Sequence, residues 1–337
     1  MNPNYAKAVL IYNPTAGRRR RRRAAQLERV KKELAQSGIS LALQATTAPG
    51  SGAALAREAV HDGAGLIIVC GGDGTINEVV CGMAHSQVPL AILPGGTANG
   101  LARELRLPLD IEAAARLIPT ATPRRIALGR VGDRYFLSMA GVGFDAQVLT
   151  KIEGRWKDRL GMTYYGMQAL RQAVFEGFTP FTISAGEKRL EATFACIARA
   201  QHYGPFRMVR EADLFSDQFY VYCFRSGNRR RYLAYALAFL QGSLNRLPDV
   251  TRFAARSVSC EQIPGSSAEV LFQVDGELAG RLPCRVEIVP DALVLLAPAQ
   301  GFGPQAGRRL TSRQRQYHPK EAHRVCACVG RAAGVES

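Results

Sequence analysis

The chain of 337 residues has no apolar run long enough to cross a membrane. Its longest nearly apolar stretch, residues 232–240, is far shorter than the ~20 residues that a spanning helix requires. The first residues also lack the succession of basic, apolar and small residues that is typical of a secretory signal. We therefore expect a cytoplasmic protein.

Paired Cys-X-X-Cys motifs are missing, although the chain has eight cysteines. The one close pair, Cys326 and Cys328, lies in a polar tail with His318 and His323 nearby. Scattered cysteines without a paired framework are typical of reduced thiols in a cytosolic protein. Zinc binding in the tail is the less favoured alternative.

Acidic residues are few, with 28 Asp and Glu against 44 Lys and Arg, and the formal net charge is +16. The basic excess is concentrated in residues 18–23, in residues 229–231 and after residue 308. Such a surface attracts polyanions, but neither the signature of an RNA-binding sheet nor zinc-finger spacing is present. We therefore expect no nucleic acid and an anionic membrane surface instead, at roughly 1 kcal/mol per basic residue. A solvated helix face is the alternative for each arginine run.

Both common phosphate-binding fingerprints are absent. No Lys-Ser or Lys-Thr follows the glycines as in a Walker A loop, and no third glycine completes Gly-X-Gly-X-X-Gly. Residues 66–79 instead read LIIVCGGDGTINEV, an apolar run followed by Asp73 between glycines. A buried parallel strand that ends in glycines presents backbone N–H groups to phosphate. Because a carboxylate beside phosphate needs Mg²⁺ or a substrate hydroxyl between the two, Asp73 favours phosphoryl transfer.

Two further glycine turns close predicted strands, at residues 13–17 and 95–99. Each offers a flexible backbone and a small hydroxyl or amide that can hydrogen-bond a phosphate. A single turn of this kind would indicate no more than an ordinary connection between a strand and a helix, where glycines are common. Three turns at one edge of a sheet predict a nucleotide site.

The first half of the chain alternates between strand and helix patterns. Strands are predicted at residues 7–13, 39–44, 66–70 and 90–93. One helix is predicted to end near residue 35, and two further helices are predicted at residues 51–61 and 76–84. This alternation predicts an α/β fold with a doubly wound parallel sheet, whose ligands bind at the carboxyl ends of the strands.

After residue 123 the pattern changes to closely spaced strands, which predicts a mostly antiparallel β-sandwich or barrel. The predicted strands are 124–131, 134–139, 181–184, 194–199, 219–224, 270–274 and 285–289, with helices at 164–175 and 230–240. We expect a nucleotide-binding domain at 1–123, a β-rich substrate domain at 124–300 and a basic, disordered tail at 301–337.

The motifs VCGGDGTINEVV, NPTAG and LPGGTANGLARELRLP closely resemble the diacylglycerol kinase catalytic domain family, which includes bacterial lipid kinases and sphingosine kinases. The resemblance covers roughly residues 6–298, with the motifs in the order and spacing of the family. The GGDG core alone would be shared with NAD kinases and phosphofructokinases, but the GGTAN segment favours the lipid branch. The resemblance implies an NAD kinase-like N-terminal domain with ATP as co-substrate and Mg²⁺ as cofactor.

The resemblance also implies ATP-binding positions in the three turns and at Thr47. They are Asn13, Pro14, Thr15, Ala16, Gly17, Thr47, Gly71, Gly72, Asp73, Gly74, Thr75, Ile76, Asn77, Gly95, Gly96 and Thr97.

The segment Asp275-Gly276-Glu277 matches a family motif whose glutamate is the proposed proton acceptor. Glu277 is therefore the predicted general base, since a carboxylate within reach of a lipid hydroxyl can take its proton as phosphate arrives. Asp73 is the second predicted catalytic residue. A hairpin turn is the alternative for residues 275 and 276.

Residues 212–219 resemble the family's structural metal loop, in which one carboxylate and two backbone carbonyls hold Mg²⁺. On this sequence the ligands would be the carboxylate of Asp217 and the carbonyls of Leu214 and Phe219. In the family a glycine usually follows the aspartate, and here that position is Gln218. The substitution affects the tight turn that the metal loop requires.

Residues 141–145 resemble a family segment near the lipid head group. Asp145, Asn99 and Asp275 are the predicted head-group residues, and a turn cap is the alternative for Asp145. The acidic position that follows in the family is matched by either Lys151 or Glu153.

We therefore expect an ATP-dependent lipid kinase that transfers the γ-phosphate to the hydroxyl of diacylglycerol or a related lipid alcohol, in phospholipid biosynthesis at the inner face of the membrane. The hydroxyl would enter a cleft between the two domains, where Asp73 helps to place Mg²⁺. The alternatives are a sphingoid-base kinase, an NAD kinase-like enzyme and a non-catalytic lipid- or nucleotide-binding regulator. A monomer and a homodimer are both open.

Overall fold

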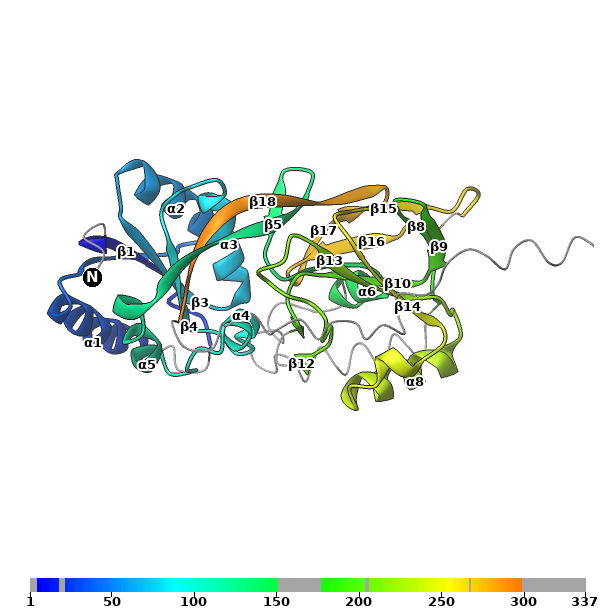
Figure 1. Cartoon of the computed structure of the whole chain (residues 1–337), viewed down its shortest axis with the longest axis horizontal. Helices are drawn as coiled ribbons and strands as arrows, with labels where there is room; N and C mark the ends of the chain where they lie inside the picture. Colours follow the sequence, from blue (N-terminus) through cyan, green and yellow to red (C-terminus); the bar gives the residue numbers. More distant parts are fainter. Residues whose placement is uncertain (1–4, 18–21, 151–176, 204–205, 267, 299–337) are drawn as a thin grey trace, which may run out of the picture. The chain divides into compact units, whose positions relative to one another are not determined.

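The N-terminal half alternates strands with helices. The computed structural model describes residues 5–17, 22–150, 177–203, 206–266 and 268–298 (Figure 1). The elements of this half are β1 (Lys7–Tyr12), α1 (Arg23–Gln36), β2 (Ser40–Ala45), α2 (Ser51–His61), β3 (Leu66–Gly71), α3 (Asp73–Met83), β4 (Leu90–Pro94), α4 (Gly100–Glu104), α5 (Ile111–Ala115) and the 3₁₀ turn η3 (Ile118–Thr120).

The first four strands are parallel and lie in the order β2-β1-β3-β4. All six residues of β3 are buried, as expected for a strand covered on both faces. Leu27, Val30 and Leu34 form the apolar stripe of α1, and they pack with α5 against one face of the sheet. Helices α2 and α3 lie on the other side of the sheet (Figure 1). All four strands therefore end at one edge, which carries the glycine turns.

The C-terminal half is rich in antiparallel strands. Its elements are β5 (Thr122–Val131), β6 (Arg134–Phe136), β7 (Met139–Gly143), α6 (Phe144–Thr150), β8 (Phe181–Ala185), β9 (Lys188–Ala192), β10 (Phe194–Ala198), β11 (His202–Tyr203), β12 (Phe206–Arg207), β13 (Phe219–Phe224), α8 (Arg229–Leu240), the 3₁₀ turn η4 (Leu244–Arg246), β14 (Val250–Ala255), β15 (Ser257–Gln262), β16 (Leu271–Val274), β17 (Glu277–Arg281) and β18 (Cys284–Ala297).

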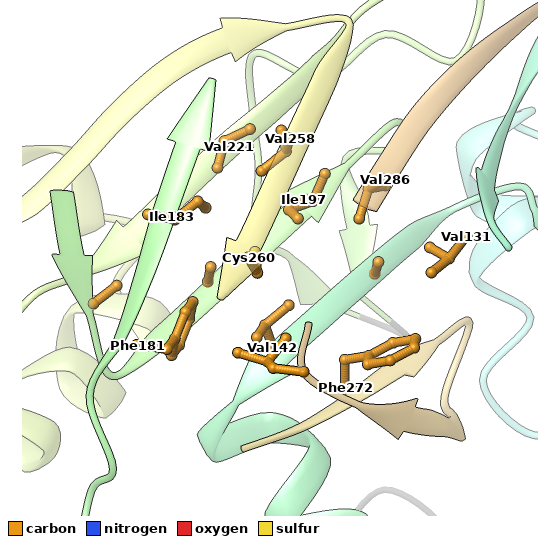
Figure 2. Close-up of a cluster of buried hydrophobic side chains, with 14 of the residues drawn as sticks. Val131, Val142, Phe181, Ile183, Ile197, Val221, Val258, Cys260, Phe272 and Val286 are labelled. Atoms are coloured by element: carbon orange, nitrogen blue, oxygen red, sulfur yellow. The ribbon is translucent and has the colours of Figure 1, made fainter. Parts of the chain in front are cut away.

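Two antiparallel layers enclose the C-terminal core. One layer has the order β14-β13-β10-β7-β16-β17, and the other is built from β5, β18, β15, β8 and β9. Figure 2 shows the apolar side chains of both layers meeting between the sheets, with Val142 and Val221 from the first layer and Val258 and Val286 from the second. The predicted mixed fold, a parallel sheet followed by an antiparallel sandwich, is confirmed.

Strand β18 joins the two halves. It pairs antiparallel with β5 from Val286 to Ala297, and on its other side Leu295 pairs parallel with Leu90 of β4 (Figure 1). The predicted strand at 285–289 was too short, because Pro290 and Asp291 interrupt the strand pattern. The structure accommodates them in an irregularity between Val289 and Leu293, where Asp291 has a φ of 51°. One continuous sheet therefore runs from β2 to β9.

Several predictions fall outside the described residues: the helix at 164–175, Lys151 and Glu153, Cys326 and Cys328, and the tail at 301–337. Six cysteines are described, at positions 70, 81, 196, 223, 260 and 284, and all six are free thiols.

Candidate active site

The three glycine turns meet at the carboxyl edge of the parallel sheet. The amide of Gly95 donates to the carbonyl of Gly71 at 2.9 Å. A Cβ on Gly96 would lie 2.5 Å from the Cα of Gly72, and a Cβ on Gly17 would lie 2.5 Å from the carbonyl oxygen of Gly95. The approach of these backbones leaves room for glycine only, and Gly17 also has a φ of 70° that favours glycine. The predicted meeting of the turns is thus present in the structure.

Asn13 ties the first turn to the second. Its Oδ1 accepts hydrogen bonds from the amide of Thr15 at 2.9 Å and from the Thr15 hydroxyl at 2.8 Å, which is the usual Asx arrangement. Its Nδ2 donates to the hydroxyl oxygen of Thr75 at 3.3 Å. The first turn is therefore shaped by its own side chain and held to the start of α3.

Arg23 holds the first and third turns together, a role that the sequence did not reveal. Its side chain is buried, and Nη2 donates to the carbonyls of Ala16 at 3.1 Å and Gly95 at 2.7 Å. Nη1 donates to the sulfur of Cys70 at 3.2 Å. Arg23 therefore does not belong to a membrane-facing run at 18–23, because its charge is used inside the protein.

Asp73 fixes the start of α4. The carboxylate is half-buried and accepts hydrogen bonds from the amides of Gly100 (Oδ2) and Leu101 (Oδ1), each at 3.2 Å. A carboxylate has about four lone-pair positions, so these two donors leave roughly half of them for other partners. Asp73 thus links the second turn to the segment that follows the third.

Asn99 closes the third turn on itself. Its Oδ1 accepts from the amide of Gly96 at 2.8 Å, and its Nδ2 donates to the carbonyl of Gly96 at 3.1 Å. Asn99 is buried and adopts a φ of 50°. The predicted head-group contact is not what this geometry favours, because both ends of the amide are used within the turn.

The remaining predicted ATP positions divide into two groups. Thr97 is exposed in the third turn, and Thr47 is exposed just beyond β2 at the same edge, where its amide donates to the Ser51 hydroxyl at 3.1 Å. Ile76 and Asn77 are buried in α3, and the amide of Ile76 donates to the carbonyl of Gly72 at 3.0 Å. The Oδ1 of Asn77 has no hydrogen-bond partner among the described residues.

Glu277 at the start of β17 approaches the second turn. Its Oε1 lies 3.5 Å from the point where a Cβ on Gly74 would stand. Its Oε2 accepts a hydrogen bond from Nη2 of Arg134 at 3.0 Å, and the side chain remains 43% exposed. The structure therefore brings the predicted base to the glycine turn that would hold phosphate.

Asp275 is an internal clamp. Its carboxylate accepts from the amides of Leu137, Ser138 and Met139 at 2.8, 3.0 and 2.9 Å. Burial raises the pKa of Asp275 to about 6, and the negative charge of Asp73 acts in the same direction. Such a pKa would suit a general base. The three amides, however, occupy both oxygens, so Glu277 is the carboxylate better placed to reach a substrate.

Asp145 supports the turn that carries Glu277. Its Oδ2 accepts from Nε2 of the buried Gln273 at 2.6 Å, and the Oε1 of Gln273 accepts from the amide of Gly276 at 2.7 Å. Gly141 makes room for this pair, because a Cβ there would lie 2.2 Å from Oδ2 of Asp145. The predicted head-group residues Asp145, Asn99 and Asp275 are thus all buried or bound from within. Gln273 was not predicted, because an isolated glutamine in a strand gives no signal.

The predicted structural metal ligands Leu214, Asp217 and Phe219 do not fit a divalent cation. The carbonyl of Leu214 already accepts a hydrogen bond from Nη2 of Arg199 at 2.5 Å. The carboxylate of Asp217 is half-exposed and lies 3.7 Å from Nη2 of Arg256. The non-glycine residues with positive φ do not include Gln218, so the missing glycine is not the obstacle. Within the described ranges, no cluster of three or more His, Cys, Asp or Glu side chains could hold a metal.

Comparisons with known proteins show which families the two halves of the chain match. The diacylglycerol kinase catalytic domain matches residues 7–131, and the YegS C-terminal NAD kinase beta sandwich-like domain matches residues 138–297. The chain is 29% identical over 283 residues to a protein named diacylglycerol kinase from Bacillus subtilis (strain 168), covering 82% of this chain and 91% of that protein. It is 36% identical over 158 residues to a protein of Chromohalobacter salexigens named "Probable lipid kinase YegS-like", covering 45% of this chain and 51% of that protein.

A solved structure has the same fold. The crystal structure of a diacylglycerol kinase from Bacillus anthracis str. Sterne superposes with a TM-score of 0.73 at 23% identity, covering 89% of this chain and 99% of that one. The two family matches follow one another along the chain and take in both the parallel sheet with its glycine turns and the sandwich with Glu277. The chain therefore belongs to the diacylglycerol kinase catalytic domain family and is a kinase whose phosphate acceptor is an alcohol.

Proposed function

We propose that the protein transfers the γ-phosphate of ATP to the hydroxyl group of diacylglycerol or a closely related lipid alcohol. The observation that supports this most directly is the approach of the Glu277 carboxylate to Gly74. Backbone amides of the glycine turns would receive the phosphates on one side, and Glu277 would face the acceptor hydroxyl on the other. The name of the Bacillus subtilis relative supports diacylglycerol as the first choice of lipid.

The site residues would divide the work between holding phosphate and moving a proton. The amides of residues 71–74 and 95–97 and the hydroxyl of Thr97 would hold the phosphates. Arg134 fixes one oxygen of Glu277, so that the other points to Gly74 and can take the proton of the hydroxyl. Leu278 is exposed beside it and would contact the apolar part of the acceptor.

Asp73 fits a magnesium ion that arrives with ATP. Mg²⁺ in kinases is usually held by one or two carboxylates, the phosphates and water, and Asp73 retains about two acceptor positions. When bound, the ion would neutralise charge on the transferred phosphate. The hydrogen bonds that the amides of Gly100 and Leu101 donate would keep the carboxylate oriented.

The function is tested by supplying Mg²⁺ and ATP labelled with ³²P in its γ-phosphate to three acceptors in separate reactions. We expect label in the lipid fraction with diacylglycerol in mixed micelles, little label with a sphingoid base, and none in NAD. The NAD reaction is included because the C-terminal family match is an NAD kinase-like sandwich. Labelled NAD phosphate would overturn the proposal, whereas a labelled sphingoid base alone would move the substrate to another lipid alcohol.

We further propose that α8 docks on an anionic membrane surface. Leu233, Leu237 and Leu240 follow a helical spacing and are 44%, 57% and 69% exposed. Arg229 and Arg230 are exposed at the other end of the helix, whereas Arg231 is bound to Asp249, with Nε 2.8 Å from Oδ2. Leucines would enter the acyl region while the two arginines meet anionic head groups. Among the residues that the structure describes, no helix is long and apolar enough to span a membrane.

Substituting Leu233, Leu237 and Leu240 together by serine should weaken binding to phosphatidylglycerol vesicles on the order of 10²-fold. Each partly buried leucine contributes about 1 kcal/mol, and 1.4 kcal/mol corresponds to tenfold. Vesicle sedimentation measures the loss, and turnover of a dispersed short-chain lipid should stay near normal. Leu109→Ser is the control, because Leu109 is 46% exposed in the other half of the chain. If the triple variant bound vesicles as well as the natural protein, the proposal that α8 docks on the membrane would be wrong.

A further inference from the structure

A buried arginine lies at the loop that the family resemblance assigned to a metal. Arg199 follows β10, and its side chain is fully buried. Its Nη2 donates to the carbonyl of Leu214 at 2.5 Å and to the carbonyl of Ser216 at 3.4 Å. These two carbonyls belong to the loop at residues 212–219, which we call the 212–219 loop. The loop is thus closed around a positive charge that the chain itself provides.

The charges of three carboxylates favour the charged form of this guanidinium. Burial lowers the pKa of Arg199 to about 10, and Asp217, Asp213 and Asp275 oppose this effect in that order. Arg199 therefore stays charged at neutral pH. The carboxylate of Asp213 shapes the loop by accepting from the amide of Phe215 at 3.0 Å. A charge this deeply buried is tolerated only where opposite charges and hydrogen-bond acceptors surround it.

The same arginine connects the loop to the site. Its amide donates to the carbonyl of Ser138 at 2.8 Å, and the amide of Ser138 donates to Asp275 at 3.0 Å. Asp275 stands two residues before Glu277. The 212–219 loop, the Asp275 clamp and the turn that carries Glu277 are therefore joined through Arg199.

We propose that the guanidinium of Arg199 takes the place of a structural divalent cation in the 212–219 loop, so that the folded state of this protein does not depend on Mg²⁺. A divalent ion bound to the Leu214 carbonyl would stand within a few ångströms of the guanidinium, and repulsion between the two would oppose its entry. An oxygen cage for Mg²⁺ also needs several ligands, whereas Asp217 turns to Arg256 at the surface. The guanidinium supplies the positive charge that a metal ion would bring, and it donates two hydrogen bonds to carbonyls of the loop.

Two nitrogens of Arg199, Nε and Nη1, are buried without a hydrogen-bond partner in the described part of the chain. The guanidinium is thus incompletely paired, although Nη2 donates to the carbonyls of Leu214 and Ser216. Removing it should expose those oxygens to one another. Their repulsion would then create an affinity for a small cation that the natural loop lacks.

The test measures thermal unfolding without nucleotide, in EDTA or in MgCl₂. The natural protein should unfold at the same Tm in both. Arg199→Gln should unfold about 10 °C lower in EDTA, because the buried carbonyls of Leu214 and Ser216 lose their charged donor. MgCl₂ should restore part of that loss, and the conservative variant Arg199→Lys should not respond to MgCl₂. Arg256→Gln, which removes the exposed partner of Asp217, is the matched control and should unfold near the natural Tm in both buffers.

Two results would overturn the proposal. One is a Tm of the natural protein that rises with MgCl₂ in the absence of nucleotide and no longer rises in Asp217→Asn. The other is an Arg199→Gln variant that is destabilised but indifferent to MgCl₂, since a plain packing role predicts that outcome. Should Arg199→Gln fail to fold, metal analysis of the dialysed natural protein decides: retained Mg²⁺ contradicts the proposal, and its absence together with an unchanged Tm in EDTA supports it. None of these measurements depends on lipid phosphorylation.

Discussion

Glu277→Gln should lower kcat for lipid phosphorylation by about 10²- to 10⁴-fold while leaving ATP binding intact, because general base catalysis typically contributes that much. Glutamine keeps the size of the side chain and an oxygen that can accept from Arg134, so the turn should not change shape. What is lost is the ability of Oε1 to take a proton beside Gly74. Turnover with a saturating lipid and calorimetric titration of ATP separate the two effects.

The matched control is Glu287→Gln on β18. Glu287 is also bound by arginines, with Arg130 of the neighbouring strand β5 at 3.1 Å and Arg285 of its own strand at 2.8 Å, but it lies outside the predicted site. Its substitution should leave kcat near normal. If Glu277→Gln retained turnover within a few-fold of the natural protein, another group would have to accept the proton. The role of Glu277 would then be structural only.

Gly96→Ala should weaken ATP binding by at least ~10²-fold and lower Tm by several degrees. The new Cβ would stand 2.5 Å from the Cα of Gly72 and 3.3 Å from its nitrogen, and backbone atoms cannot rotate away. Over-packing of this kind typically costs about 1–3 kcal/mol. A displacement of ~1 Å in groups that position a substrate can cost 10²-fold. Titration with a non-hydrolysable ATP analogue gives the affinity, and a thermal melt gives the stability.

Gly177→Ala serves as the control for this substitution, because a Cβ at Gly177 would meet nothing within 4 Å. Its affinity for the analogue and its Tm should equal those of the natural protein. Normal nucleotide affinity in Gly96→Ala would mean that the second and third turns do not hold phosphate together. The proposal that ATP lies along the glycine turns would then be abandoned.

The parallel sheet could be predicted from the sequence because its signals are local. The run LIIVCG of β3 is apolar at every position, as a strand covered on both faces must be, and the glycines mark where it ends. The second part of β18 could not be predicted. Pro290 and Asp291 interrupt the strand pattern, and the pairing with β4 joins residues about two hundred positions apart. Which strands pair over such a distance depends on tertiary packing, and a short segment of sequence contains no information about it.

The site was predictable to the same extent. Glycines at the turns and the carboxylates of Asp73 and Glu277 are visible as residue types, because the chemistry restricts what can stand there. Arg23 was hidden within six consecutive arginines, and nothing in the sequence says which of them turns inward. Nothing in the sequence indicates that Arg199 is buried and bound to the 212–219 loop either. Asn99 and Asp275 were recognised as polar site residues, but whether they face a ligand or the backbone depends on the fold.

The position of β18 between β4 and the sandwich strands has a consequence for biosynthesis. A nascent chain that has left the ribosome up to residue 131 already contains all three glycine turns, yet the outer edge of β4 has no neighbour until residues near 295 have been translated. Unpaired edges of this kind attract other chains. The half of the protein that carries the turns therefore lacks this neighbour until β18 has been made, and chaperones that shield exposed edges can act on it until then.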